Sequence, residues 1–352
     1  MTARYRGLLV VAFAAGVGCT SSGNASTTIP GGGAETAAPS PGVPARGRPI
    51  TLPAHLEGDR FYIEGTTTEG YPLRFFTATG GGLFITQAAV DRAALPTATI
   101  DAGDGTAMIA ARFPDFDWDA WIPHLDSLAG RIPVLPDVEA RVANVDADGI
   151  LGMPWFKDRS WTFDYGKGEM LLRAQNDLPR AESAHRISLG FPVDPTTKAR
   201  VTSYARVSIE VDGAVIDLLL DTGATVELTP AAVALIDPSG PARRGTCFVT
   251  QTIFETWRAK HPEWRVVEGA DRWAQGEPMI EVPRVNLASF AVGPVWFTRR
   301  PDQALGEISQ FTDKPVSGAL GGSALKYFRV HIDYPAALAA FELASSPPAD
   351  GE

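Results

Sequence analysis

The sequence predicts a mainly β (all-β) protein made of two homologous lobes, with a few short helices. Three observations support this prediction. An internal repeat covers most of the chain, an apolar run in its second half ends in an Asp-Thr-Gly-Ala loop, and the 352 residues include 35 Gly and 28 Pro. Glycine and proline at that frequency favour short strands joined by turns over a helical bundle.

The clearest strand is the apolar run at residues 215–220, which follows a hairpin-type turn at Asp212-Gly213 and is broken only by Asp217. A run of that length and character indicates a largely buried strand. Asp221, directly at its end, would be costly to bury unless it is hydrogen-bonded or chemically active. The alternative is a carboxylate that only accepts hydrogen bonds within a turn, as Asx residues often do.

One block of the repeat contains this loop. Residues 70–90 align without gaps on residues 213–233, at a constant offset of 143 (221 minus 78). The aligned loop positions are Ala78, Thr79, Gly80 and Gly81 in the first copy, and Asp221, Thr222, Gly223 and Ala224 in the second. The first copy therefore has an alanine where the second copy has its aspartate.

A second block follows in the same order. Residues 148–165 align without gaps on residues 317–334, at a constant offset of 169 (317 minus 148). Two blocks repeated in order indicate one duplicated unit. Because the offset increases by 26 (169 minus 143), the second lobe is the longer one between the blocks. We expect this extra length to include a helix at residues 252–261, with capping-box spacing from Thr252 to Glu255.

The loop and the repeat together resemble the aspartic peptidases of the retropepsin and pepsin types. In that family the loop ends a strand, an apolar-apolar-Gly segment crosses beneath it, and a strand ending in Asp-Tyr follows. The chain has the complete loop once and the other two segments twice. The matching segments are Leu151-Gly152 with Asp164-Tyr165, and Leu320-Gly321 with Asp333-Tyr334. The resemblance covers residues 61–341 and implies two aspartic-peptidase-type β lobes.

The resemblance implies a peptidase in which Asp221 activates water. Such enzymes use two carboxylates that share one proton, one from each lobe. Here the first lobe supplies Ala78, whose methyl group neither donates nor accepts a proton. A positioned acid–base group is worth about 10²–10⁴ in rate. Three functions are therefore open: hydrolysis of peptide bonds, inactive binding of peptides or envelope components between the lobes, and a purely structural role.

Two routes would supply a second carboxylate. Asp146 or Asp148 would act as a substitute within the chain, or two copies would pair through their second lobes and bring two Asp221 side chains together. A covalently linked lobe has the higher effective concentration, which favours pairing within the chain. In the family the loop threonines hydrogen-bond across the lobe interface, so Thr79 and Thr222 would hold the architecture without the acid.

The first residues predict export. Arg4 and Arg6 precede an apolar run at residues 8–17 that is too short for a stable membrane span. Cys19, directly after Gly18, is typical of a lipoprotein cleavage site, and acylation there would tether the protein to a membrane surface in the cell envelope. Ordinary cleavage that leaves Cys19 as a passive thiol is the alternative.

The expected organisation has six parts, and two domains of ordinary size fit the length of the folded region. The parts are a signal peptide at 1–19, a flexible Gly/Pro/Ser linker at 20–54, a degenerate aspartic-peptidase-like lobe at 55–172, an inter-lobe linker at 173–200, the retropepsin-like lobe with the intact loop at 201–343 and a tail at 344–352. The linker would hold the folded body away from the membrane.

The charge and composition of the chain restrict the classes of partner that we expect it to bind. The net charge of −10 argues against a nucleic-acid partner, which needs a basic surface. If Cys19 is acylated, Cys247 has no partner, so no disulfide framework is expected. The histidines show no ligand spacing, and we expect no metal and no cofactor. The expected partners are a peptide or protein substrate, a membrane through the N-terminus and, through the second lobe, a second copy of the chain.

Two other motifs have structural explanations. An aromatic cluster in the first lobe would line a cleft or, more commonly, pack in a core, and the acids that alternate with it lack the glycine-bearing loop of a calcium site. The cluster is Phe113, Phe116, Trp118 and Trp121, and the acids are Asp115, Asp117 and Asp119. Ser323 and Lys326 match the S-x-x-K of acyl-transferring enzymes, but the first copy has no serine at that position, so the lysine is a feature of the repeat.

Overall fold

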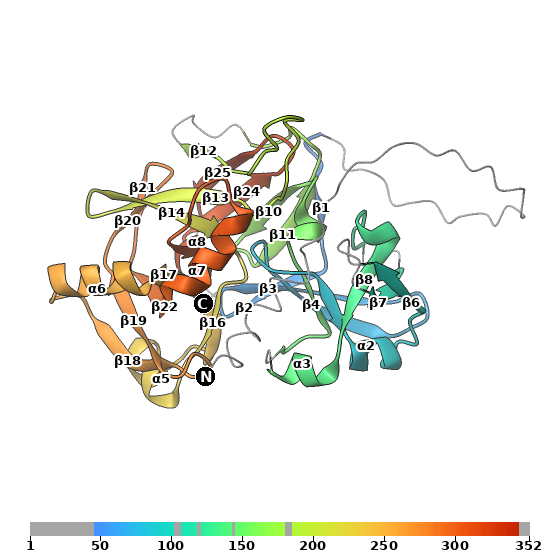
Figure 1. Ribbon diagram of the computed structural model, residues 1–352, viewed down its shortest axis with the longest axis horizontal. Helices are drawn as coiled ribbons and strands as arrows, with labels where there is room; N and C mark the ends of the chain where they lie inside the picture. The colour runs from blue at the N-terminus through green and yellow to red at the C-terminus, as the bar shows by residue number, and fades with distance from the viewer. Residues whose placement is uncertain (1–45, 102–106, 118–120, 143–144, 180–184, 345–352) are drawn as a thin grey trace, which may run out of the picture.

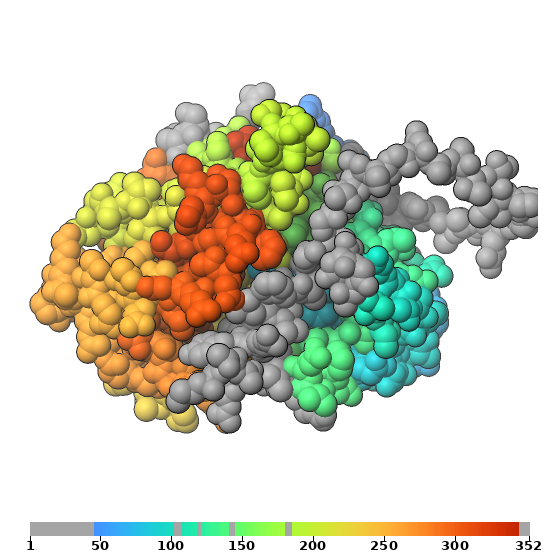
Figure 2. Space-filling model, viewed as in Figure 1, coloured from blue at the N-terminus to red at the C-terminus, as the bar shows by residue number. Residues whose placement is uncertain are grey.

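The computed structural model describes residues 46–101, 107–117, 121–142, 145–179 and 185–344. Strands account for 44% of it and helices for 17%, which confirms the predicted mainly β class with few short helices. Figure 1 shows a central sheet that contains β10, β11, β24 and β25, with β14, β17 and β22 to one side and β6, β7 and β8 to the other. In Figure 2 the second lobe, yellow to red, lies on the left and the first lobe, cyan to green, lies on the right.

Lobe one is built on an eight-stranded sheet in the order β2-β3-β4-β9-β5-β8-β7-β6. β9 is parallel to β4 and antiparallel to β5, so it lies between the strand that enters the Ala78 loop and the strand that leaves it. The elements are β2 (Ala54–Glu57), β3 (Arg60–Thr66), β4 (Pro72–Thr77), β5 (Phe84–Thr86), α2 (Gln87–Arg92), β6 (Thr97–Asp101), β7 (Ala107–Arg112), η1 (Leu128–Gly130), β8 (Arg131–Leu135), α3 (Asp137–Val142), β9 (Gly149–Leu151) and α4 (Met153–Phe156).

Lobe two contains a nine-stranded sheet in the order β18-β19-β22-β17-β23-β14-β13-β20-β21. β23 is parallel to β14 and antiparallel to β17, as β9 is to β4 and β5. The elements are β13 (Arg206–Val211), β14 (Ala214–Leu220), β15 (Thr225–Glu227), α5 (Pro230–Ile236), β16 (Arg243–Gly245), β17 (Cys247–Thr250), α6 (Gln251–Lys260), β18 (Val266–Asp271), β19 (Glu277–Val282), β20 (Val285–Leu287), β21 (Phe290–Val292), β22 (Val295–Arg300), α7 (Asp302–Ile308), η3 (Ser309–Phe311), β23 (Gly318–Leu320) and α8 (Gly322–Leu325).

A six-stranded sheet joins the lobes in the order β1-β11-β10-β24-β25-β12. At its centre β10 pairs antiparallel with β24, and Thr162 stands directly opposite His331. These two side chains occupy the same position of the repeat and contact each other, so an approximate twofold axis passes between them. The strands are β1 (Ile50–Thr51), β10 (Ser160–Asp164), β11 (Glu169–Arg173), β12 (Arg186–Ser188), β24 (Phe328–Asp333) and β25 (Leu338–Leu343).

One hydrophobic core extends through both lobes and this sheet. Buried side chains from lobe one, such as Phe61 and Phe163, belong to the same contiguous cluster as Leu218 and Val330. Because burial of apolar surface is the main stabilising contribution to folding, the lobes form one body. Among the described residues, no helix is long and apolar enough to cross a bilayer.

Beyond the Asp221 loop, the strand pairing aligns the two lobes at a different offset from the 143 residues of the sequence alignment. In lobe one the strand that pairs with β9 is β5, and Thr86 at its end caps α2. In lobe two the strand that pairs with β23 is β17, and Thr250 at its end caps α6. Phe84-Ile85-Thr86-Gln87 therefore corresponds to Phe248-Val249-Thr250-Gln251, at an offset of 164 (248 minus 84).

The predicted origin of the extra length in lobe two is therefore wrong. α6 has a counterpart in lobe one, namely α2, so it is not an addition. Most of the extra length lies where the offset changes from 143 to 164, at residues 225–245, and forms β15, α5 and β16. Here we call residues 225–245 the lobe-two insertion. Its β15 pairs only with β16, in a separate two-stranded sheet.

The predicted capping box of the helix is also wrong, although the helix itself is present. The N-cap is Thr250, whose hydroxyl accepts a hydrogen bond from the Ile253 N–H. Thr252 lies inside the first turn, and its hydroxyl donates to the Asp302 carboxylate. A hydroxyl placed inside the first turn cannot reach the free N–H groups that a cap satisfies.

Candidate functional site

The Asp221 loop is positioned by the hairpin of β13 and β14. Its two-residue turn has Asp212 at φ 51° and Gly213 at φ 77°, the left-handed pair that matches the twist of a hairpin. β14 is buried at its loop end, where Leu218, Leu219 and Leu220 pack in the core. Burial fixes the register of a strand, because a slip of one residue would reverse every side chain. The loop that follows therefore has a fixed position.

Two threonines hydrogen-bond across the lobe interface. The Thr79 hydroxyl accepts from the Thr222 N–H at 3.0 Å and donates to the Leu220 carbonyl at 2.9 Å. The Thr222 hydroxyl accepts from the Thr79 N–H at 3.2 Å. Both side chains are buried. The structure therefore brings together the two threonines for which the sequence predicted this contact.

The Asp221 carboxylate accepts one hydrogen bond from each lobe. Its Oδ1 atom accepts from the Gly223 N–H at 2.9 Å and from the Gly80 N–H at 3.1 Å. Burial raises the pKa of Asp221 above the usual aspartate range, and the two N–H groups oppose that shift by stabilising the charged form. The residue as a whole is half-buried.

Ala78 has the same backbone environment as Asp221. The Ala78 N–H donates to the Leu151 carbonyl at 3.1 Å, and the Asp221 N–H donates to the Leu320 carbonyl at 2.9 Å. Each residue also accepts in the turn that follows, from Gly81 at 2.9 Å and from Ala224 at 3.2 Å. The two residues thus occupy equivalent positions, and only one of them carries an acid.

Glycines let the two loops approach each other closely. A Cβ atom on Gly80 would lie 2.6 Å from Cβ and Cγ of Asp221, and one on Gly223 would lie 2.3 Å from Cβ of Ala78. Distances under 3.0 Å are not compatible with a side chain unless neighbouring atoms move. Each glycine therefore packs on the first residue of the opposite loop, which places Asp221 and Ala78 together at the lobe interface.

The two apolar-Gly segments lie beneath the loops, as the resemblance implies. Leu151 and Leu320 are fully buried at the ends of β9 and β23. A Cβ atom on Gly152 would lie 1.9 Å from the Gly82 carbonyl oxygen, and one on Gly321 would lie 2.1 Å from that of Thr246. Only glycine fits at either position, because the backbone of the loop region lies against it.

The two suggested substitute carboxylates are bound to other groups. Asp146 accepts from Arg60 at 3.3 Å and from the Tyr62 hydroxyl at 2.9 Å, and it forms an ion pair with Arg243 of the lobe-two insertion at 2.7 Å. Asp148 accepts from a backbone N–H of β4 and forms an ion pair within lobe one. Burial alone would raise the pKa of Asp146, but its guanidinium partners hold that pKa below the usual range, which disfavours a role as proton donor.

The other described residues that the sequence singled out, Ser323, Lys326 and Cys247, make structural contacts. The Ser323 hydroxyl accepts from the Trp296 N–H at 2.7 Å, whereas the Lys326 ammonium lies near the Tyr327 ring. The Cys247 thiol is buried against Gly321, and burial raises its pKa to about 12, so it is protonated and unreactive at neutral pH. Cys19 lies outside the described residues.

The aromatic cluster of lobe one is core packing in its described part. Phe113 is 3% exposed and contacts Phe75, and Phe116 packs against both rings. Trp118 and Asp119 lie outside the described residues. In the described part of the chain no group of three metal-ligating side chains comes together. Asp115 is instead paired with Arg112 and His124.

Sequence reasoning missed the second hydrogen bond of Asp221 and the contacts of the lobe-two insertion. The insertion holds the β2–β3 turn of lobe one, since the Gly245 N–H donates to the Gly58 carbonyl at 2.6 Å. The four-residue match between Phe84–Gln87 and Phe248–Gln251 is the sequence signal that locates the insertion. Nothing in the sequence indicates that Gly80 donates to Asp221, because the two residues lie 141 positions apart.

Comparison with known proteins adds no relative. No protein-family model matches the chain, and no curated protein matches it.

Proposed function

We propose that this protein binds extended peptide segments between its lobes, as an aspartic-peptidase-like protein that lacks the second catalytic carboxylate. One observation carries the proposal: Asp221 and Ala78 lie at equivalent positions of two loops that pack directly on each other. The position that would hold a second acid contains a methyl group. A dyad that shares one proton cannot form from a single carboxylate.

The loops retain what a peptide-binding site needs. Asp221 is partly exposed and accepts from only two N–H groups, so the carboxylate keeps acceptor capacity for a ligand. Its raised pKa increases the protonated fraction at mildly acidic pH. A protonated carboxyl group donates one hydrogen bond to a peptide carbonyl, whereas the charged form accepts one from a peptide N–H. Either state therefore binds a backbone.

A second candidate function is slow peptide hydrolysis by Asp221 alone. It is favoured by the hydrogen bonds that the Asp221 carboxylate accepts from Gly80 and Gly223 and by its raised pKa. In this case one carboxylate would activate water without an acid opposite to protonate the leaving group. A single positioned acid–base group is worth about 10²–10⁴ in rate. Turnover would therefore be lower than in a two-acid enzyme by about that factor.

Export and membrane attachment through Cys19, and a homodimer through lobe two, stay predictions. Within one chain, Thr79 and Gly80 of lobe one already bond to the Asp221 loop. A second copy of lobe two would have to displace them. The intramolecular contact has the advantage of a high effective concentration.

The test is a peptide library measured for binding and for cleavage over a range of pH and protein concentration. The proposal predicts saturable binding without turnover, and weaker binding in Asp221→Ala. Turnover that is abolished in Asp221→Asn would support the second candidate instead, and turnover that rises with the square of concentration would support the dimer. Failure to bind any peptide would overturn the proposed function.

A further inference from the structure

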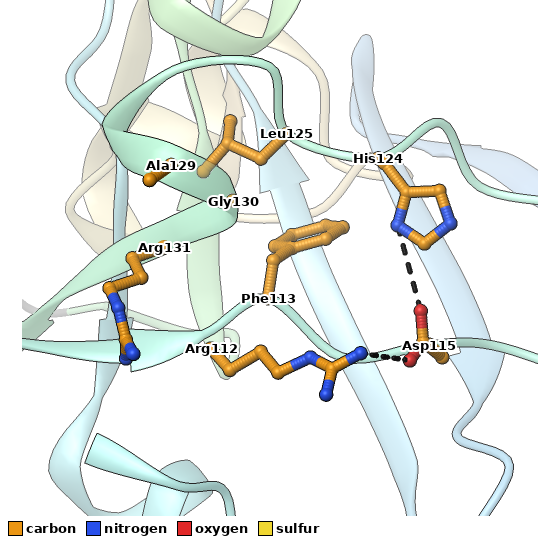
Figure 3. Close-up of a pocket in the computed structure, with 8 residues that line it drawn as sticks. All are labelled: Arg112, Phe113, Asp115, His124, Leu125, Ala129, Gly130 and Arg131. Carbon is orange, nitrogen blue, oxygen red and sulfur yellow. Dashed lines mark hydrogen bonds and ion pairs between the residues drawn. The ribbon is translucent and has the colours of Figure 1, made fainter. Parts of the chain in front are cut away.

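A pocket of about 260 Å³ lies at one end of β7 and β8, outside the site described above (Figure 3). Figure 3 shows the Phe113 ring in the middle of this pocket, Asp115 and His124 on one side and Arg131 on the other. Leu125 lies next to the ring and completes an apolar wall. The pocket thus combines an apolar centre with charged ends.

The charges at the two ends of the pocket are not balanced. On one side Arg112 forms an ion pair with Asp115 at 3.0 Å, and His124 lies 3.7 Å from the same carboxylate. On the other side the Arg131 Nη1 atom is buried and has no hydrogen-bond partner in the described structure. An unsatisfied buried donor on a charged group is costly, so this guanidinium has hydrogen-bonding capacity that no described residue uses.

The register of the strands increases this imbalance. Arg112 and Arg131 stand directly opposite each other on antiparallel β7 and β8. Like charges at such positions destabilise a sheet. Among the described side chains that line the pocket, Asp115 pairs with Arg112 and no carboxylate pairs with Arg131, so the arginines exceed the carboxylates by one charge. A single negative charge would balance it.

From these contacts we propose that the pocket binds a small monocarboxylate with a short apolar group. The carboxylate binds the Arg131 guanidinium, whose fork of N–H groups matches two carboxylate oxygens. The apolar group contacts the small part of Phe113 and Leu125 that faces the pocket, the rest of both side chains being buried in the core. A dianion such as phosphate fits less well, since it would carry excess negative charge towards Asp115 and leave the apolar wall without a partner.

The test is a titration of the full chain with 3-methylbutanoate, followed by calorimetry and by amide NMR shifts of β7 and β8. The controls are 3-methylbutanamide, which has the same shape without the charge, and inorganic phosphate. We expect saturable binding of the carboxylate only. Equal binding of the amide, preferred binding of phosphate, or no saturable shift at millimolar concentration would each overturn the proposal.

Variants separate this site from a general charge effect. Arg131→Met, which keeps much of the length of the side chain, should weaken binding of the carboxylate by about tenfold or more, because a charge-assisted bidentate pair is lost. Arg284→Met, at an exposed arginine of lobe two, is the matched control and should leave binding unchanged. Arg131→Lys, a second variant that keeps the charge, should give an intermediate loss. Unchanged binding in a folded Arg131→Met protein would contradict the assignment.

Discussion

The Ala78 loop and the Asp221 loop have the same backbone and different chemistry. Both first residues donate to the strand beneath, both accept within the turn that follows, and both pack on a glycine of the opposite loop. Only Asp221 carries a carboxylate. The architecture of this interface therefore depends on the threonines, the glycines and the backbone, and it persists where one acid is absent.

The hydrogen bonds of Asp221 extend to the loop that lacks an acid. Gly223 donates to the carboxylate of its own loop, but Gly80, its equivalent, has no such acceptor in lobe one and donates across the interface to Asp221. A buried N–H group without a partner is costly. Asp221 thus satisfies the amides of both loops, which gives it a structural role in addition to any chemical one.

The largest expected effect comes from making the two loops chemically equal. Ala78→Asp places a second carboxylate at the lobe interface, where Gly223 packs on the Ala78 Cβ atom and Gly80 packs on Asp221. Two acids that share one proton would supply both a base and a donor, so we expect peptide hydrolysis to rise by about 10²–10⁴ over the natural chain. The measurement is cleavage of an unstructured peptide between pH 3 and pH 7.

The control for this gain is the double variant Ala78→Asp with Asp221→Asn, which again has one acid. It should lose the gained activity while remaining folded. If the single variant is folded and shows no increase in cleavage, the equivalence of the two positions does not extend to chemistry, and the lobe interface lacks some other feature of a peptidase.

We expect the two loop threonines to contribute unequally to the free energy of unfolding. Thr79 makes two hydrogen bonds through its hydroxyl and Thr222 makes one. Replacement of either by valine keeps the shape and leaves buried groups unsatisfied, at about 1–3 kcal/mol for each group. We expect Thr79→Val to reduce the free energy of unfolding more than Thr222→Val, as measured by urea denaturation.

Thr99→Val, at an exposed position of β6, is the control and should change stability little. Equal losses in the two loop variants would mean that the interface is energetically symmetric, contrary to the hydrogen bonds. A loss below that of the control in both variants would remove the threonines from the account of what holds the lobes together.

Thr162 and His331, the pair at the twofold axis, allow a comparison of the two lobes that depends on pH. His331 is buried with its Nδ1 atom 2.8 Å from the Thr162 hydroxyl, and burial, together with Arg329 and Arg173, lowers its pKa to about 3. The unfolded chain takes up a proton near pH 6.5 and the folded chain does not. The contribution of neutral His331 to the free energy of unfolding is therefore complete above pH 6.5. Below that pH it declines by about 1.4 kcal/mol per pH unit.

His331→Thr, which makes the axis symmetric, should flatten the decline of stability between pH 6.5 and pH 4. The measurement is the difference in unfolding free energy between variant and natural chain at each pH, in which the groups that do not contact His331 cancel; Glu342, whose carboxylate lies 3.4 Å from the His331 Nε2 atom, does not cancel. His55→Gln, at a surface histidine, is the control. A difference that does not vary with pH over this range would show that folding does not lower the pKa of His331.

Much of this arrangement could be predicted from the sequence, because the relevant signals are local. The apolar strand before Asp221, the repeat and the paired apolar-Gly segments are each readable within a few residues, and they place the loops correctly. The insertion was misplaced because Ala231-Ala232-Val233 resembles Ala88-Ala89-Val90, and both helices begin after a capping threonine. Strand pairing, which is long-range, shows directly that β17 rather than β15 lies beside β23, and the match of Phe84–Gln87 with Phe248–Gln251 is its short counterpart in the sequence.

The smallest expected effect concerns the turns that lead to the two loops. Gly70 and Gly213 occupy equivalent positions of the repeat, at φ 89° and φ 77°, and no atom lies within 4 Å of a Cβ at either. Replacement by alanine should therefore destabilise through backbone conformation alone, by about 1 kcal/mol. Gly213 lies in a two-residue turn that cannot relax, so its loss should exceed that at Gly70, which lies in a longer loop.

Gly306 provides a control of opposite sign. It lies inside α7, also has open space around it, and does not have a left-handed φ. Alanine there should stabilise the protein by about 0.4–1 kcal/mol, because the unfolded chain loses freedom and the helix gains propensity. Thermal unfolding of the three variants separates the explanations. A loss at Gly306 equal to that at Gly213 would point to a general cost of removing glycine, whereas opposite signs would assign the cost to the left-handed turns that position Asp221 and Ala78.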